Sequence, residues 1–290
     1  MRVNSRRIHV AETGVEIALL DWGGVGPLAL FHHATGFCAG VWEPVAEYLL
    51  PHFRVMALDA RGHGDSSHPT ALDAYHWECF AADFSGVACA LARAETDSRV
   101  ALAVGHSLGG AAALATAARH PDLFARLVLI DPVIPSPELP RDGQLAQEVG
   151  RRLVEGARRR RRVFASRAAA RQRWEERALF RDWDPRALDA YARCGLRERA
   201  DGQVELKCHP EVEAAIFDQT GSLDLLPLAD RVHIPSLVLW TARGEFSRTV
   251  YEDLARRMQY AHVEDLDAGH LAPMAAPEAV AKAILSFAVE

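Results

Sequence analysis

Short apolar runs alternate with segments of helical spacing along the first half of the chain. The runs are apolar throughout rather than at every second residue, which predicts strands buried on both faces, as in a parallel sheet covered by helices. Between them, apolar residues recur every three or four positions and predict helices. The expected strands are residues 15–20, 27–31, 53–58, 99–104 and 127–130, and the expected helices are residues 41–50, 75–93 and 108–119.

The alternation stops at Asp131, and the residues that follow contain no convincing strand. Only residues 204–208 offer a weak strand candidate, whereas long helical stretches occur at 145–165 and 167–180. An interruption of about 90 residues is far too long for an ordinary loop, so it is expected to be an element with its own role.

The strand pattern returns in the last quarter of the chain. Strands are expected at residues 236–241 and 263–266, followed by a closing helix at 277–289. The core is therefore α/β and is split by an insertion. The expected domains are an α/β core formed by residues 1–131 and 231–290, and a mainly helical cap formed by residues 132–230.

Composition excludes several classes of protein. With 290 residues, 49% of them hydrophobic, the chain suffices for one large core with an insertion. A net charge of -6 does not favour a nucleic-acid partner. Five scattered cysteines without a C-x-x-C pair argue against a disulfide framework or a zinc site and fit a reducing compartment. Neither a signal-peptide h-region nor an apolar span of bilayer length is visible, so we expect a cytoplasmic protein without a membrane partner.

The segment Gly105-His106-Ser107-Leu108-Gly109 lies between a predicted strand and a predicted helix. In this context a G-x-S-x-G motif predicts a nucleophilic serine on a sharp strand-to-helix turn, with its hydroxyl exposed above the sheet. The two glycines leave room where strand and helix pass closely. The N–H of Leu108 is then free to stabilise an oxyanion beside the positive end of the helix.

A serine hydroxyl is a weak nucleophile until a base accepts its proton. His270 follows the last predicted strand, at the carboxyl edge of the sheet where Ser107 is also expected. The chain contains 13 histidines, so it is this position rather than the residue type that favours His270 as the general base.

These segments together resemble the α/β-hydrolase superfamily over essentially the whole chain. The resemblance implies an eight-stranded, mostly parallel sheet with a cap inserted after the sixth strand, and by position it assigns a second oxyanion donor to the N–H of Thr35. The segments that carry it are residues 32–36 (His-His-Ala-Thr-Gly), 59–66 (Asp-Ala-Arg-Gly-His-Gly-Asp-Ser), 105–110 (Gly-His-Ser-Leu-Gly-Gly) and the pair Gly269-His270.

The acid that orients the histidine is the point where the chain departs from the family pattern. Relatives usually carry an aspartate after the seventh strand, but Ser247 occupies the corresponding position here. Asp131, at the end of the sixth strand, is our preferred acid, and Glu245 is the alternative. Asp267 is close to His270 in sequence and is interpreted as a loop residue.

Two further clusters in the sequence suggest binding but are better explained otherwise. The arginines of the cap, including a run at 158–162, are interleaved with acidic residues, which is typical of a solvated surface, although one of them could bind a substrate carboxylate. The spacing of the histidines does not fit a metal site. These histidines are His32, His33, His63, His68 and His76.

The sequence therefore predicts a serine hydrolase that uses Ser107, His270 and Asp131 without a cofactor or metal. A small or medium carboxylic ester or lactone is the expected small-molecule substrate, and a homodimer is left open. The alternatives are hydrolysis of a carbon–carbon bond in diketone-like compounds, and a non-catalytic binding protein that retains the hydrolase fold.

Overall fold

The computed structural model describes residues 3–134, 143–244 and 246–289. Its largest element is an eight-stranded sheet in the order β1-β2-β4-β3-β5-β6-β10-β11. The pairs β1–β2 and β2–β4 are antiparallel and all others are parallel. The strands are β1 (Asn4–Val10), β2 (Val15–Gly23), β3 (Leu28–His32), β4 (Arg54–Leu58), β5 (Val100–His106), β6 (Phe124–Ile130), β10 (Ser236–Thr241) and β11 (Ala261–Leu266).

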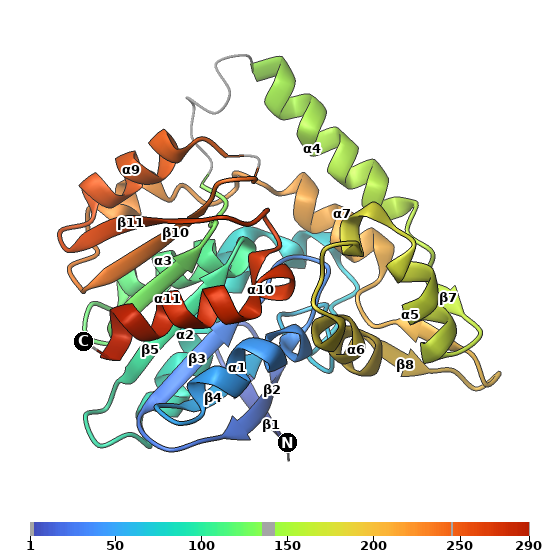
Figure 1. Ribbon diagram of the computed structural model, residues 1–290, viewed down its shortest axis with the longest axis horizontal. Coiled ribbons are helices and arrows are strands. Elements are labelled where there is room, and N and C mark those ends of the chain that lie inside the picture. The colour runs from blue at the N-terminus through green and yellow to red at the C-terminus, as the bar shows by residue number, and fades with distance from the viewer. Residues whose placement is uncertain (1–2, 135–142, 245, 290) are drawn as a thin grey trace.

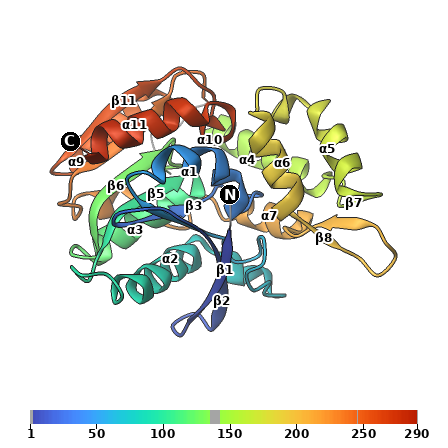
Figure 2. The same ribbon diagram turned by 60° about the horizontal axis from the view of Figure 1, so that its bottom comes forward.

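Helices cover both faces of this sheet and bury two separate layers of apolar side chains (Figures 1 and 2). One layer lies under α2, α3, α8 and α9, and the other lies under α1 and α11. The helices are α1 (Glu43–Leu49), α2 (Trp77–Ala92), α3 (Leu108–Arg119), α8 (Leu226–Ala229), α9 (Arg248–Arg257), α10 (Ala272–Ala275) and α11 (Pro277–Val289), with short 3-10 helices at Ala39–Trp42 and Leu72–Tyr75.

The architecture confirms the predicted fold class, and all seven strands expected in the core are present. The eighth strand, β1, was missed. It lies at the edge of the sheet, and its residues are mostly exposed and polar. An edge strand of this kind buries too little surface to show an apolar run, and its charged residues protect the open edge from pairing with another chain.

The inserted segment packs beside the core as helices around a small sheet (Figure 1). This sheet, in the order β7-β9-β8, is antiparallel, so the expectation of no convincing strand was wrong, although the weak candidate at 204–208 coincides with β9. Strands of two or three residues are too short to show a period of two. The elements are α4 (Gly143–Arg158), β7 (Val163–Phe164), α5 (Arg167–Glu175), a 3-10 helix (Ala178–Phe180), α6 (Pro185–Cys194), β8 (Leu196–Glu198), β9 (Val204–Leu206) and α7 (Pro210–Asp218).

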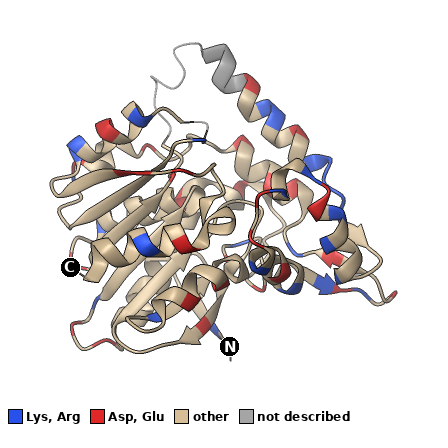
Figure 3. Cartoon of the chain, viewed as in Figure 1, with Lys and Arg blue, Asp and Glu red and all other residues tan. Residues whose placement is uncertain are grey.

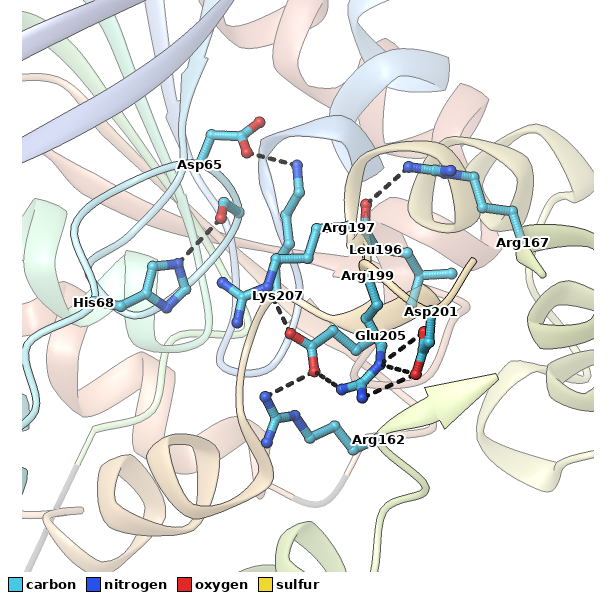
Figure 4. Close-up of polar contacts among 11 residues, drawn as sticks. Asp65, His68, Arg162, Arg167, Leu196, Arg197, Arg199, Asp201, Glu205 and Lys207 are labelled. Atoms are coloured by element: carbon cyan, nitrogen blue, oxygen red, sulfur yellow. Dashed lines mark hydrogen bonds and ion pairs between the residues drawn. The ribbon is translucent and has the colours of Figure 1, made fainter. Parts of the chain in front are cut away.

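Basic and acidic residues are interleaved along the cap (Figure 3), and many of them form ion pairs. Figure 4 shows the densest group, in which the buried carboxylate of Glu205 on β9 accepts from three arginines. Burial alone would raise the pKa of Glu205, but these arginines lower it below its ordinary value. The network ties the edges of the small sheet together. The arginines are Arg162 (2.7 Å), Arg197 (2.8 Å) and Arg199 (3.0 Å).

In the part of the chain that the structure describes, no helix is both long enough and apolar enough to cross a bilayer.

Candidate active site

Ser107 occupies the turn between β5 and α3, and its backbone is strained. Its φ of 56° and ψ of -118° lie in a region that residues with a side chain rarely adopt. The turn is held because the Ser107 N–H donates to the carbonyl oxygen of Ile130 (3.1 Å) and the Ser107 carbonyl oxygen accepts from the N–H of Ala111 (3.1 Å). The geometry is that of the strand-to-helix turn expected from the motif.

The glycines around Ser107 are needed for close contact between backbones. A Cβ atom on Gly105 would lie 2.2 Å from the carbonyl oxygen of Gly109, and one on Gly109 would lie 2.3 Å from the carbonyl oxygen of His32. Both contacts are with backbone atoms, which cannot move away as a flexible side chain could. Any side chain at these positions would therefore separate α3 from the sheet.

His270 lies between Ser107 and Asp131. Its Nε2 is 3.0 Å from the Ser107 Oγ, and its Nδ1 is 2.6 Å from Oδ2 of Asp131. A carboxylate can only accept, so Nδ1 carries the proton that it donates to Asp131, and Nε2 is free to accept the proton of the serine hydroxyl. The three side chains thus form a continuous hydrogen-bonded chain from buried carboxylate to hydroxyl.

Asp131 is fully buried and held from several sides. The Tyr251 hydroxyl lies 2.9 Å from Oδ1 of Asp131 and 3.1 Å from the carbonyl oxygen of Pro132. The backbone N–H of Asp131 donates to the carbonyl oxygen of Leu239 (2.9 Å). Its φ of 40° places it in the left-handed region at the point where the chain leaves β6 for the cap. Burial, followed by the charge of Asp131, raises the pKa of Tyr251 well above its ordinary value, so the phenol stays a donor.

The other residues considered for the position of the acid either lie away from His270 or fall outside the described residues. Glu245 lies outside the described residues. Asp267 is 92% exposed and pairs with Arg243 (3.1 Å) on the surface. Ser247 bonds to the hydroxyl of Thr249 (2.8 Å) at the start of α9. Of the carboxylates that the structure describes, Asp131 is the one that contacts His270.

The loop that carries His270 is anchored by His106, the residue directly before the serine. His106 Nε2 is 2.7 Å from the carbonyl oxygen of His270. Burial, followed by the neighbouring His270, lowers the pKa of His106 to about 3. The His106 ring is therefore neutral at ordinary pH, and its N–H donates to that carbonyl. This bond fixes the backbone of the loop directly beside the imidazole of His270.

The two N–H groups expected to bind an oxyanion lie in α3, directly after Ser107, and in the loop after β3, the strand beside β5. Leu108 begins α3, so its N–H belongs to the free first turn of a helix. Thr35 belongs to the segment after β3, which neighbours β5 in the sheet. Among the described residues, neither N–H donates to another backbone or side-chain group. Both donors are therefore available to a ligand in the site.

Two buried histidines hold the loop that contains Thr35, which we call the oxyanion loop (residues 33–36). The Nε2 of His33 accepts from the N–H of Ala60 (2.9 Å), so its Nδ1 donates to the carbonyl oxygen of Ala34 (2.7 Å). The Nε2 of His63 accepts from the N–H of Gly36 (2.9 Å). Burial lowers the pKa of both rings, that of His63 to about 3, so both are neutral. These ring nitrogens all form hydrogen bonds with backbone groups.

No group of three or more residues suited to binding a metal ion occurs among the described residues. Sequence analysis did not identify Tyr251 or His106 as part of the site. Tyr251 lacks a local signal because its hydrogen-bond partner is 120 positions away. His106 occupies the variable position of the motif, but a polar residue in an apolar strand is a detectable anomaly.

Comparison with known proteins identifies the family of this chain and several relatives. Residues 29–283 match the sequence profile described as Alpha/beta hydrolase family. Over 127 residues the chain is 39% identical to a 2-(acetamidomethylene)succinate hydrolase from Mesorhizobium japonicum, covering 44% of this chain and 42% of that protein. Over 125 residues it is 35% identical to a bifunctional esterase/perhydrolase from Acinetobacter calcoaceticus, covering 42% and 43%.

In both cases the matched segment spans less than half of the curated relative. Structural similarity extends further: the crystal structure of E-2-(acetamidomethylene)succinate hydrolase superposes with a TM-score of 0.81 at 25% identity, covering 100% of both chains. On the profile match, the chain belongs to the alpha/beta hydrolase family.

Proposed function

We propose that this protein is a serine hydrolase that cleaves a small or medium carboxylic ester or lactone. The observation that carries the proposal is the continuous chain from Ser107 Oγ through His270 to Asp131, with contacts of 3.0 and 2.6 Å. A serine in a strained turn, an imidazole within hydrogen-bond distance of it and a buried carboxylate are the parts that nucleophilic acyl transfer requires.

Acylation begins when Ser107 Oγ attacks the carbonyl carbon of the substrate and its proton passes to Nε2 of His270. Asp131 stabilises the resulting imidazolium through Nδ1. The tetrahedral intermediate collapses, the bond to the leaving alkoxide breaks, and the alkoxide takes the proton from Nε2 to leave as an alcohol. An acyl-enzyme on Ser107 remains.

Deacylation repeats these steps with water as the nucleophile. Water gives its proton to Nε2 of His270 as its oxygen attacks the acyl carbon. Collapse of the second intermediate releases a carboxylic acid and returns the proton to Ser107 Oγ. The N–H groups of Thr35 and Leu108 are the proposed donors to the negatively charged oxygen in both intermediates.

Support for an ester or lactone comes from the chemistry of this site together with one relative. The Acinetobacter protein is described as an esterase/perhydrolase. A Ser-His-Asp arrangement cleaves esters more readily than amides because an alkoxide is a better leaving group than an amide anion. The first relative acts on 2-(acetamidomethylene)succinate, and we do not transfer that substrate here because the match covers less than half of each protein.

A fluorophosphonate probe tests the proposal directly. It should label the wild-type protein and Thr249→Ala, a surface hydroxyl variant, but not Ser107→Ala. The wild-type protein should also turn over p-nitrophenyl acetate with a burst equal to one acyl group per chain.

Labelling that survives in Ser107→Ala would refute the assigned nucleophile. A folded wild-type protein that neither labels nor turns over esters would favour the non-catalytic binding protein. Turnover of diketones in the absence of ester turnover would favour carbon–carbon bond hydrolysis.

A further inference from the structure

One arginine of the cap differs from its neighbours in the run at 158–162. Arg158 and Arg159 expose 56% and 78% of their side chains, whereas Arg160 exposes only 18%. Arg160 is directed inward, where its Nη1 is 2.5 Å from the carboxylate of Glu213 on α7 and its Nη2 is 2.7 Å from the hydroxyl of Tyr191 on α6. Its position is therefore set by two other elements of the cap.

These cap residues converge on the backbone of Gly36 in the oxyanion loop. The Gly36 carbonyl oxygen is 2.9 Å from the Tyr191 hydroxyl and 3.4 Å from Arg160 Nη1. An arginine can only donate, so Tyr191 accepts from Arg160 and must use its one proton to donate to Gly36. A Cβ atom on Gly36 would lie 2.4 Å from the Glu213 carboxylate, and φ here is +84°, so the contact requires glycine.

Arg160 and Tyr191 do not change their protonation states at ordinary pH. Burial raises the pKa of Tyr191 above its ordinary value. Burial would lower the pKa of Arg160, but Tyr191 and Glu213 raise it above its ordinary value. Arg160 is therefore always charged and Tyr191 always protonated, so the direction of the hydrogen-bond chain from Arg160 to Gly36 does not reverse with pH.

Each of three consecutive peptide groups in the loop is held by a different side chain. His33 binds the carbonyl of Ala34, in the peptide that carries the N–H of Thr35 (2.7 Å). His63 binds the N–H of Gly36 in the next peptide (2.9 Å). Tyr191 and Arg160 bind the carbonyl of Gly36 in the third. The first two supports come from the core. The third comes from the cap, in addition to a turn bond within the loop from the N–H of Phe37 to the carbonyl oxygen of Ala34 (3.3 Å).

We propose that Arg160 and Tyr191 are positioning residues that fix the oxyanion loop from the cap, and that their hold on the Gly36 carbonyl helps to keep the N–H of Thr35 directed at the developing oxyanion. The inference rests on the proposed function, because it assigns a catalytic use to Thr35. It explains why Arg160 is turned away from solvent while Arg158 and Arg159 are exposed. Neither residue touches the substrate in this role.

The test compares Tyr191→Phe and Arg160→Met with Arg171→Met. Arg171 is a cap arginine that pairs with Asp189 and Glu175 on the surface and has no bond to the oxyanion loop. Loss of a whole oxyanion donor lowers kcat by about 10²–10³, so a misdirected donor should cost about tenfold in Tyr191→Phe and about 10–100-fold in Arg160→Met. KM for p-nitrophenyl acetate should stay within twofold, and Arg171→Met should match the wild type.

A second readout separates positioning from general structural damage. Affinity for an alkyl trifluoromethyl ketone, which forms a tetrahedral adduct with the serine, should fall by the same factor as kcat/KM. Arg160→Lys, which keeps the charge but loses the fork that spans Tyr191 and Glu213, should recover only part of the loss. If Arg160→Met does not fold, Tyr191→Phe decides alone, since it removes a single oxygen atom.

The inference is overturned if Tyr191→Phe keeps wild-type kcat/KM per titrated active site, or if KM rises while ketone affinity is unchanged. A lower Tm with unchanged turnover per active site also overturns it. These outcomes differ from failure of the proposed function, in which the wild-type protein itself shows neither labelling at Ser107 nor ester turnover.

Discussion

Replacing Asp131 by asparagine tests the catalytic arrangement most directly. The change keeps the size of a fully buried side chain but removes its charge. If the amide oxygen keeps the bond from Tyr251, the amide NH2 faces Nδ1 of His270, which must then accept a hydrogen bond. The imidazole proton moves to Nε2, where it faces Ser107, and the histidine can no longer accept the serine proton.

The expected loss of kcat combines two effects, the lost charge of Asp131 and the changed tautomer of His270. Unit charges about 4 Å apart attract each other by about 4 kcal/mol at an effective dielectric constant of about 20. Loss of that attraction from the imidazolium in the transition state corresponds to about 10³ in rate. The unfavourable tautomer adds to this, so we expect kcat to fall by about 10⁴ in Asp131→Asn.

The assay is hydrolysis of p-nitrophenyl acetate, with kcat normalised to the concentration of active sites. Asp267→Asn is the matched control, because it makes the same chemical change on the His270 loop at a side chain that is 92% exposed. The control should keep wild-type kcat. If Asp131→Asn retains kcat within tenfold of the wild type, the reasoning is refuted, and a large loss in Glu245→Gln would then transfer the role to Glu245.

Three further predictions concern the surroundings of the triad. Tyr251→Phe leaves the buried carboxylate of Asp131 one donor short, so it should lower the free energy of unfolding by about 1–3 kcal/mol and reduce kcat; unchanged urea unfolding and kcat would exclude this support. Gly109→Ala should destabilise by about 3 kcal/mol, because its Cβ would lie 2.3 Å from a backbone oxygen, whereas Gly150→Ala, which has open space, should stabilise by about 0.5–1 kcal/mol in the same urea assay. The pKa of His63 is lowered from 6.5 to about 3, so its contribution to stability is complete above pH 6.5 and declines as the pH falls from 6.5 towards 3; at pH 5 the loss should be about 2 kcal/mol. A shallower pH dependence in His63→Gln would agree with this, and an identical one would contradict it.

Much of the core was predictable because its buried elements carry strong patterns. The helices 108–119 and 277–289 have the predicted limits, since apolar spacing and flanking polar or proline residues define them locally. The fold class and the positions of the strands around Ser107 followed from runs that are apolar on both faces. Asp131 and His270 could be placed at one edge of the sheet because parallel strands end there together.

The remaining features depend on contacts that the sequence does not show locally. β1 pairs along its whole length with β2 yet buries little, so only its partner defines it. In the cap, the helix expected at 145–165 ends at Arg158, and the one expected at 167–180 ends at Glu175. These segments follow tertiary contacts rather than their own spacing.

The strained backbone of Ser107 means that the proposed nucleophile costs this protein stability. A backbone in a sparsely populated region costs about 1–3 kcal/mol for a residue with a side chain, and glycine avoids much of that cost. Selection for stability alone would therefore favour glycine at position 107. A Ser107→Gly variant is therefore expected to gain stability at the expense of the proposed activity.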